Sequence, residues 1–468
     1  MATGAVSTSR AEGRNGAAPA QVDELSFRQS DANAKERSVG SRLRDVVSVK
    51  DFGAVGNGAT DDTAAFQSAL NAAKTVHVPV GNYRISAKLR MGRHTNLVGE
   101  HEKFSVITGT HAGVMFEFPE DNTDPRLERL LIDGAGCTGV AVGTGNGPLQ
   151  SYLIRPQLES VHFSHTMAFG INANCIFARL MKCSFGFEGA GQRAGTMVGI
   201  RSFSSKANYT NLNRLEACIF QVGTASPGSI AAQISGGAVW VFDGCDFEGC
   251  GRAVQLSNVQ LAKFTNCWFE ANSATDWVVD VGACLTPTQF ENCNLTNNKA
   301  KACIQWNSRV GAGIVARYCA FGLSASSQPV RDQGAGVARS DTGGKLVWDG
   351  NHVYGGQPAN RSIPEAAAGS PGGVNAWFVC DTRGAGTILA SSHPGIAPVA
   401  RGGVGDLSIT LPWPTASAAD RICVVATSGT ATVNAATEGG PQRIRVKAYL
   451  LGTATPTDAV VSVMVMGL

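Results

Sequence analysis

The sequence predicts an all-β protein: a right-handed parallel β-helix with a short N-terminal capping helix and a small C-terminal β-sandwich-like domain. Three observations support this fold class. The chain has 468 residues, which exceeds one modal domain. Its 56 glycines and its charged fraction of only 16% are typical of turn-rich and strand-rich chains, and they exclude disorder and coiled coil. A short motif also recurs at intervals of 22 to 35 residues, which are the lengths of coils rather than of helix pairs.

The repeated motif has three defined positions. An apolar residue lies three positions before a central residue, and an aromatic or aliphatic residue lies two positions after it. Six consecutive copies have cysteine at the centre. The central positions are Leu130, Val161, Cys183, Cys218, Cys245, Cys267, Cys293, Cys319 and Asn351.

Each copy predicts two short strands joined by a corner. The central residue and the aromatic are two apart and face the same side of a strand, whereas the first apolar residue lies three before the centre and breaks the alternation. Glycine or asparagine, which accept a left-handed backbone, precede the centre at Gly244, Asn266, Asn292 and Gly350. A third strand is expected between copies, as in 251–258, 277–282 and 302–307. Each coil therefore has about three strands.

Of the thirteen cysteines, the six at the centres of the repeat are expected to be reduced core residues. Stacked strands place equivalent sulfurs about 4.8 Å apart, whereas a disulfide needs about 2 Å. Disulfides or metal ligands are the alternative, but no C-x-x-C or histidine pairing accompanies the repeat. We therefore expect a ladder of cysteines beside a ladder of phenylalanines, and no metal site.

The N-terminal part divides near residue 46. Residues 1–45 contain a single aromatic, Phe27, and are predicted to be an attachment segment that needs a partner to become ordered. After a strand and a Gly/Asn turn, Phe66, Ala69, Leu70 and Ala73 fall on one helical face. Such a helix can cover the open end of a β-helix, so we assign residues 46–355 to the β-helix with its cap.

The C-terminal part begins after the repeat stops. Residues 356–373 are rich in glycine and proline and predict a linker, and 374–468 contain short strand patterns typical of a small β-sandwich. The apolar end, 459–468, is about half the length that spans a bilayer, so we expect a paired or subunit-facing strand and no membrane segment.

Charge and the N-terminal composition bear on location and partners. The net charge is +3 and no Lys/Arg block is long enough to follow a phosphate backbone, so nucleic acid is not an expected partner. The first forty residues contain no apolar run of the secretory kind, and we expect folding in a cytosol.

Candidate catalytic residues occupy the outward positions, one and three after the centre. There, Asp246 and Glu248 on one coil adjoin Trp268 and Glu270 on the next. Glu248 and Glu270 are the predicted catalytic pair, with Asp246 as an alternative partner and Trp268 as the sugar platform. Two carboxylates beside an aromatic ring supply the acid, the base or nucleophile and the sugar platform of a glycoside hydrolase. Same-column acids lie about 5 Å apart, near the retaining spacing, and the diagonal pair about 7 to 8 Å apart, near the inverting one. The alternative is that these acids are solvated surface.

Candidate substrate-binding residues lie on the following strands. Gln255, Asp280 and Gln305 belong to an outward column from Arg201 to Arg331 that can bind sugar hydroxyls or face a neighbouring subunit. Trp268, Trp277 and Trp306 are the predicted sugar platforms, with core packing or subunit contact as the alternative.

The segment DFGAVGNGATDDTAAFQSALNAA, residues 51–73, resembles the opening of the pectate-lyase-like β-helix superfamily found in bacteriophage tailspikes and capsule depolymerases. Residues 38–50 resemble the join between the virion-anchoring segment and the β-helix of such tailspikes. The resemblance implies a homotrimer that is assembled in the bacterial cytoplasm, is attached to the phage tail or baseplate through residues 1–45, and acts at the host cell surface.

The same resemblance implies a protein that binds, and often cleaves, a host surface polysaccharide. The resemblance does not identify a catalytic residue in this chain, because members of the family place their acids on different coils. The calcium-binding aspartates of the lyases also have no counterpart in this sequence. We therefore expect a depolymerase of the glycoside hydrolase type without a cofactor. A non-catalytic receptor-binding tail protein and a polysaccharide lyase remain the alternatives.

Overall fold

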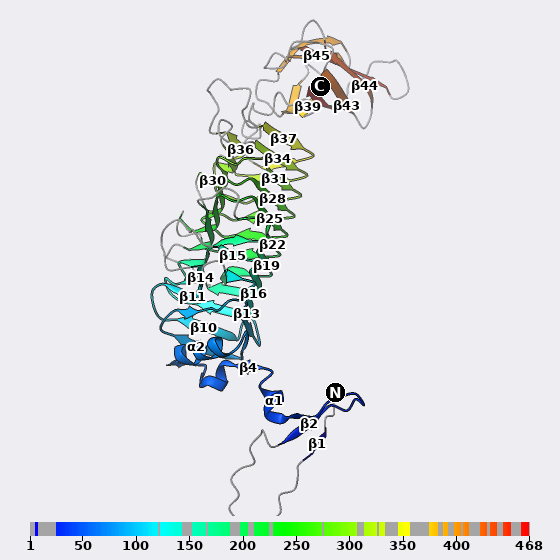
Figure 1. Ribbon diagram of the computed structural model, residues 1–468. Helices are drawn as coiled ribbons and strands as arrows, with labels where there is room; N and C mark the ends of the chain where they lie inside the picture. The colour runs from blue at the N-terminus through cyan, green and yellow to red at the C-terminus, as the bar shows by residue number, and fades with distance from the viewer. Residues whose placement is uncertain are drawn as a thin grey trace, which may run out of the picture.

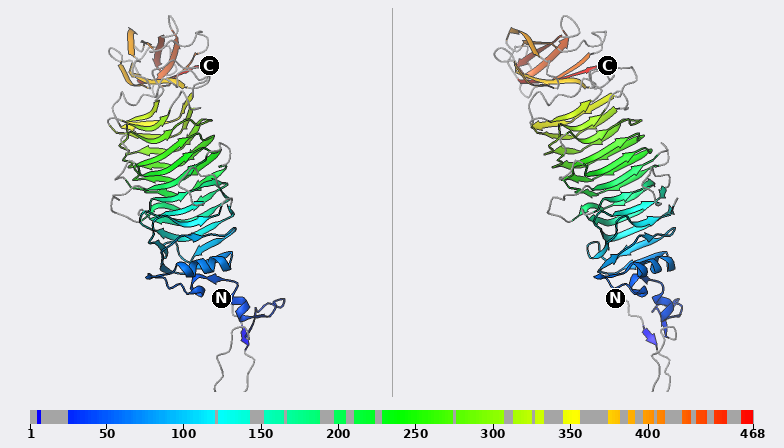
Figure 2. Two further views of the ribbon diagram at one scale, coloured as in Figure 1. Left: turned by 60° about the vertical axis from the view of Figure 1, so that its left-hand side comes forward. Right: turned by 90° about the vertical axis from the view of Figure 1, so that its left-hand side faces the viewer.

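The computed structural model describes residues 5–7, 25–119, 122–142, 152–164, 167–187, 197–204, 210–223, 228–273, 276–306, 313–324, 327–332 and 345–355, and the backbone of eight C-terminal strands. Short strands stack in successive coils along one axis, and Figures 1 and 2 show this column from three sides. Nearly all pairs within the column are parallel and join one coil to the next. The predicted parallel β-helix is confirmed.

Three faces make up each coil. The first face consists of β4 (Val47–Ser48), β6 (Thr75–Val78), β9 (Asn96–Gly99), the first halves of β13 (Arg126–Asp133) and β16 (Gln157–Ser164), β19 (Arg179–Met181), β22 (Asn213–Glu216), β25 (Val239–Asp243), β28 (Leu261–Thr265), β31 (Thr288–Glu291), β34 (Gly313–Arg317) and β37 (Lys345–Asp349).

The second face consists of β5 (Asn57–Asp61), β7 (Gly81–Ile85), β10 (Ser105–Gly109), the second halves of β13 and β16, β20 (Ser184–Phe187), β23 (Ile219–Phe220), β26 (Asp246–Glu248), β29 (Trp268–Glu270), β32 (Asn294–Thr296), β35 (Ala320–Leu323) and β38 (His352–Gly355).

The third face is a ten-stranded sheet of β8 (Leu89–Arg90), β11 (Val114–Phe118), β14 (Thr138–Val142), β17 (Phe169–Asn172), β21 (Val198–Phe203), β24 (Ile230–Ser235), β27 (Arg252–Ser257), β30 (Trp277–Val281), β33 (Ala302–Trp306) and β36 (Gln328–Asp332). A small parallel sheet of β12 (Asn122–Thr123), β15 (Tyr152–Ile154) and β18 (Asn174–Ile176) adds a fourth side to some early coils.

The corner between the first and second faces is the predicted single left-handed residue. Gly244, Asn266, Asn292 and Gly350 have φ between 51° and 60°. The amide of Asn266 donates to the Glu291 carbonyl oxygen of the next coil at 3.0 Å, so the corner keeps its backbone hydrogen bond. Lys182, Ala217 and Tyr318 adopt the same conformation in other coils although it is less favourable for them.

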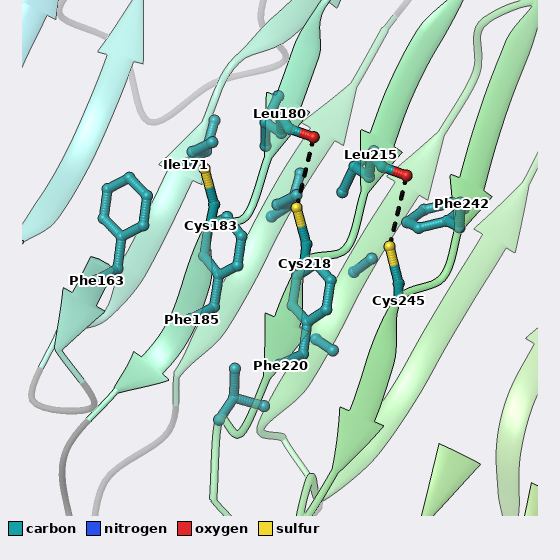
Figure 3. Close-up of a cluster of buried hydrophobic side chains, with 14 of the residues drawn as sticks. Phe163, Ile171, Leu180, Cys183, Phe185, Leu215, Cys218, Phe220, Phe242 and Cys245 are labelled. Carbon is teal, nitrogen blue, oxygen red and sulfur yellow. Dashed lines mark hydrogen bonds between the residues drawn. The ribbon is translucent and has the colours of Figure 1, made fainter. Parts of the chain in front are cut away.

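The core contains the predicted ladders of cysteine and phenylalanine. Phe163, Phe185, Phe220, Phe247 and Phe269 are fully buried, and successive rings stack with centroids 4.7 to 5.0 Å apart. The six repeat cysteines are buried and free of disulfides. Each of five thiols donates to a carbonyl oxygen one coil earlier, as from Cys218 to Leu180 and from Cys245 to Leu215 (Figure 3). Burial raises the pKa of Cys175 to about 12, which keeps this thiol protonated and unreactive.

The cap is built around α2 (Thr63–Ala72), which lies at the N-terminal end of the coils in Figure 1. Phe66, Ala69 and Leu70 are buried, as their helical spacing predicts, and the Phe66 ring packs edge-on against Tyr83. Asp62, the residue before the helix, accepts hydrogen bonds from the amides of Val55 and Gly56. Its carboxylate therefore ties the preceding Gly/Asn turn to the start of the helix.

The segments outside the coils contain further regular structure. β1 (Ala5–Ser7), β2 (Ser26–Arg28) and β3 (Arg37–Ser38) form an antiparallel sheet, followed by α1 (Val39–Leu43) and the 3-10 helix η1 (Val49–Phe52). The C-terminal strands form two four-stranded antiparallel sheets, β40 (Thr387–Ser391), β39 (Val374–Asp381), β46 (Val460–Gly467) and β43 (Ile422–Thr427), and β41 (Ala397–Gly403), β42 (Asp406–Thr410), β45 (Arg443–Leu450) and β44 (Ala431–Thr437). The apolar end is thus paired in a sheet, between β39 and β43. The sandwich packing and the domain boundaries stay predictions.

Candidate functional site

The predicted acidic residues lie together on the second face. β26 and β29 pair in parallel, with Asp246 opposite Trp268 and Glu248 opposite Glu270. Phe247 and Phe269, between them in sequence, are fully buried, so the alternation of the strand turns the four flanking side chains outward. We call Asp246, Glu248, Trp268 and Glu270 the acid patch.

Asp246 is the unusual member of the patch. Its side chain is half-buried, and its Oδ1 atom is buried without a hydrogen-bond partner among the described residues. Burial, and then the negative charges of Glu248 and Glu270, raise the pKa of Asp246 to about 6. This carboxyl group therefore holds its proton over a pH range in which an ordinary aspartate is ionised.

The two glutamates are held by neutral donors. The carboxylate of Glu270 accepts from Asn297 Nδ2 at 2.6 Å and from Trp268 Nε1 at 2.7 Å, and these bonds lower its pKa. Glu248 accepts from Gln221 Nε2 at 3.2 Å. The patch thus contains one carboxyl group biased toward the acid form and another biased toward the ionised form, which is the pairing that acid and base catalysis require.

An aromatic surface accompanies these acids. Trp268 is 44% exposed, and its indole is oriented by the bond to Glu270. Further along the second face, Tyr354 is also exposed, donates from its hydroxyl to Thr296 Oγ1 at 2.9 Å, and stacks with His352. Two exposed rings on one face can each pack against a sugar ring.

Sequence reasoning did not assign roles to Asn297, Gln221 and Tyr354. Tyr354 and Gln221 fall in the same outward column as Glu248 and Glu270. Their place in that column is the sequence feature that could have indicated a position beside the acids. Asn297 has a left-handed backbone at the next corner, and no sequence pattern indicates that its amide donates to Glu270 in the preceding coil.

Gln255, Asp280 and Gln305 lie on the third face and are not brought into the acid patch. Their predicted column is confirmed, because Arg201, Gln233, Gln255, Asp280, Gln305 and Arg331 pair in that order. Gln233 donates to Gln255 at 2.9 Å and Gln305 donates to Asp280 at 3.4 Å. Burial raises the pKa of Asp280. These side chains bond to one another along the ladder.

The tryptophan predictions need correction at two positions. Trp306 is 1% exposed and belongs to the hydrophobic core, because it follows Val281 and Leu256 in an inward column. Trp277 is 5% exposed and lies under the guanidinium of Arg252, which is 4.5 Å from its ring centroid. Neither ring is exposed in this chain, whereas Trp268 is.

The register of the second face departs from the prediction at one place. Ser164 pairs with Phe187 rather than with Gly186, because Gly186 has a φ of 89° and forms a bulge. Close to this bulge, His162 Nδ1 and Ser184 Oγ lie 2.6 Å apart, and Glu102 Oε1 is 3.9 Å from His162 Nε2. The acidic neighbour of His162 comes from the loop before β10 and is distant in sequence.

The described ranges contain neither a candidate metal site nor a membrane-spanning helix. Within them, no three His, Cys, Asp or Glu side chains converge in a way that suits a metal ion. The longest described helix, α2, has ten residues, and none of the described helices has the length and hydrophobicity that a bilayer crossing requires.

Two family models and several known proteins are similar to parts of this chain. The family model "Rhamnogalacturonase A/epimerase, pectate lyase-like" matches residues 46–122, and "Right handed beta helix region" matches residues 158–317. The solved tailspike protein of Acinetobacter phage vB_ApiP_P1 is similar with a TM-score of 0.56 and 16% identity, over 95% of this chain and 92% of that chain.

Two relatives match shorter parts. The pre-neck appendage protein of Bacillus phage B103 is 29% identical over 144 residues, 28% of this chain and 16% of that protein. Mannuronan C5-epimerase AlgE3 of Azotobacter vinelandii is 58% identical over 43 residues, 8% of this chain and 2% of that protein. The chain therefore spans only a small part of the length of these relatives. The resemblance expected from residues 51–73 is confirmed: a pectate-lyase-like family model matches residues 46–122, a right-handed β-helix model matches residues 158–317, and the chain has the fold of a phage tailspike.

Proposed function

We propose that this protein is a phage tailspike that binds a host surface polysaccharide and cleaves it by glycoside hydrolysis. The observation that carries the proposal is the acid patch, where a half-buried carboxyl group of raised pKa adjoins two glutamates and an exposed tryptophan. Its setting on a fold shared with a phage tailspike supports the substrate class.

In the proposed mechanism Asp246 is the general acid. Its raised pKa keeps a proton available near neutral pH, and that proton passes to the oxygen of the scissile glycosidic bond as the bond breaks. Glu248 and Glu270 favour the protonated form of Asp246 through their negative charges, so they help Asp246 to keep the proton that it donates, even where they do not touch the substrate.

Glu270 is the proposed base. Asn297 and Trp268 lower its pKa and fix the orientation of its carboxylate, so it is ionised and available to accept a proton from a water molecule. Asp246 and Glu270 are diagonal neighbours on adjacent strands, and such pairs are about 7 to 8 Å apart. This spacing falls in the range of inverting enzymes, in which a water molecule fits between the two groups.

Assembly and location follow from the same proposal. We infer a homotrimer on the virion tail, attached through residues 1–45 to a tail or baseplate protein and acting at the host cell surface. The antiparallel β1–β2–β3 sheet lies in this segment, before the cap. The pre-neck appendage match supports a place among phage tail parts.

The test is to incubate the trimer with purified host polysaccharide and to analyse the products by mass spectrometry. Addition of one water molecule per cleaved bond supports hydrolysis, whereas an unsaturated uronic acid in the product would establish a lyase. Asp246→Asn and Glu270→Gln are expected to abolish cleavage while the trimer still binds glycan. Binding without cleavage by the wild-type protein would instead establish a receptor-binding tail protein.

A further inference from the structure

We propose that the sugars bound across the acid patch carry no negative charge, so that the substrate is a neutral or amino-sugar glycan at these subsites rather than a polyuronate. This inference rests on the proposed function and adds the substrate class to it. It comes from the distribution of charge over the three faces of the coils.

The described strands of the second face around the patch are acidic and contain no lysine or arginine. β23, β26, β29, β32, β35 and β38 contain no lysine or arginine, and their acidic residues are Asp246, Glu248 and Glu270. The imidazole of His352, at the far end of this stretch, is the one side chain in these strands that can gain a positive charge. Thus a bound glycan meets carboxylates, amides, hydroxyls and aromatic rings.

Among the described residues, no ion pair joins a carboxylate of the patch to a lysine or an arginine, and the hydrogen-bond donors of the two glutamates are neutral. Glu270 is held by the amide of Asn297 and the indole of Trp268, and Glu248 by the amide of Gln221, all of which are neutral donors. The charges that act most strongly on Asp246 are those of the two glutamates. The patch therefore keeps a negative potential that faces outward.

The first face shows the contrasting arrangement. There, acids lie beside cations along the coils: Glu128 with Arg126, Glu216 with Arg179 and Arg214, Asp243 with Arg214, and Glu291 with Lys263. On the third face Arg252 is paired with Asp276 and lies over Trp277. These paired cations are thus engaged away from the acid patch, and the exposed Lys299 and Lys301 lie beyond the corner that follows β32, outside the strands of the patch.

A sugar carboxylate at the patch would be repelled. At an effective dielectric constant of about 20, a like charge 6 to 8 Å away lowers affinity by at least about tenfold. Hydroxyl and amino groups instead donate hydrogen bonds to Glu248 and Glu270, and an uncharged ring stacks on Trp268. The patch therefore selects against uronates at the sugars that it contacts.

The experiment compares two charge states of one glycan. A panel of purified capsular and O-antigen polysaccharides, both neutral and uronate-bearing, is screened with the full-length trimer for chain cleavage. The best substrate is then converted chemically to the form of opposite charge state. A neutral glycan is oxidised at its primary hydroxyls to carboxylates, and a uronate glycan is reduced at its carboxyls to hydroxymethyl groups. Binding of each pair is measured at low and high salt.

We expect the uncharged form to bind at least about tenfold more tightly at low salt, and the difference to shrink at high salt, because salt screens the repulsion. Glu248→Gln should reduce the difference in affinity between the uncharged and the acidic form of the glycan. Glu291→Gln, which removes a carboxylate of the first face paired with Lys263, is the matched control and should leave the difference unchanged.

The outcomes separate this inference from the proposed function. Tighter binding or faster cleavage of the acidic form would overturn the inference and leave the depolymerase intact. Equal binding of the two forms at low salt would also overturn it. If the folded trimer neither binds nor cleaves any polysaccharide of the panel, the proposed function fails, and the inference fails with it.

Discussion

Replacing Asp246 by asparagine is expected to stabilise the folded protein above about pH 6 while it abolishes cleavage. The pKa of Asp246 rises from 3.8 to about 6 on folding, so the folded state binds a proton more tightly than the unfolded state. The free energy of unfolding therefore falls as the pH rises from about 4 to about 6, and the loss is complete above that range. The asparagine side chain of the variant cannot ionise, so the variant does not suffer this loss.

The magnitude follows from the size of the pKa change. At 1.36 kcal/mol for each pH unit, a rise from 3.8 to about 6 corresponds to about 3 kcal/mol. Asp246 is only half-buried, so solvent screens part of the unfavourable interaction, and we expect a gain of about 1 to 1.5 kcal/mol. This gain should appear at about pH 8 and nearly vanish at about pH 3, where both folded and unfolded Asp246 are largely protonated.

Thermal unfolding of the trimer, scanned at one rate at each pH, measures the effect. Asp349→Asn, which removes an exposed carboxyl from β37, is the matched control and should not change the pH dependence. A gain of equal size at both pH values, or no gain at about pH 8, would show that the Asp246 carboxyl is not destabilised in the folded chain. The assignment of Asp246 as the general acid would then lose its basis.

Four further predictions test the ladder, the aromatic assignments and the assembly. The eleven buried cysteines should resist a water-soluble thiol reagent in the folded protein and react after denaturation, and rapid labelling of most of them would contradict the ladder. Trp306→Ala should lower the free energy of unfolding by about 3 to 5 kcal/mol. Trp268→Ala should leave the free energy of unfolding unchanged and weaken glycan binding about three- to tenfold. The reverse result would make Trp268 the core residue and Trp306 the sugar platform. Mass photometry should find a trimer, and a stable monomer at micromolar concentration would argue against a tailspike. A chain beginning at Val46 should fold, trimerise and bind the same polysaccharide, and failure to recognise it would give residues 1–45 a receptor role.

The fold and the register of the second face could be predicted from the sequence because the repeat fixes both. In a strand the side chains alternate, so an inward cysteine and phenylalanine two residues apart determine which neighbours face outward. That rule alone placed Asp246 and Glu248 beside Trp268 and Glu270, and the pairing confirms it. The left-handed corners could be anticipated where glycine or asparagine precedes the centre.

Only the tertiary structure decided the positions of the third-face aromatics and the chemistry of each acid. On the third face Ala253 and Val254 are adjacent and both buried, so the alternation is interrupted and the direction of Trp277 or Trp306 cannot be counted along the strand. The pKa of each carboxyl group depends on burial and on donors from other coils, such as Asn297 for Glu270. Where the alternation is regular, local sequence fixes which side of a strand a residue faces. The environment on that side is supplied by residues 20 or more positions away, which only the stacking of the coils brings into contact.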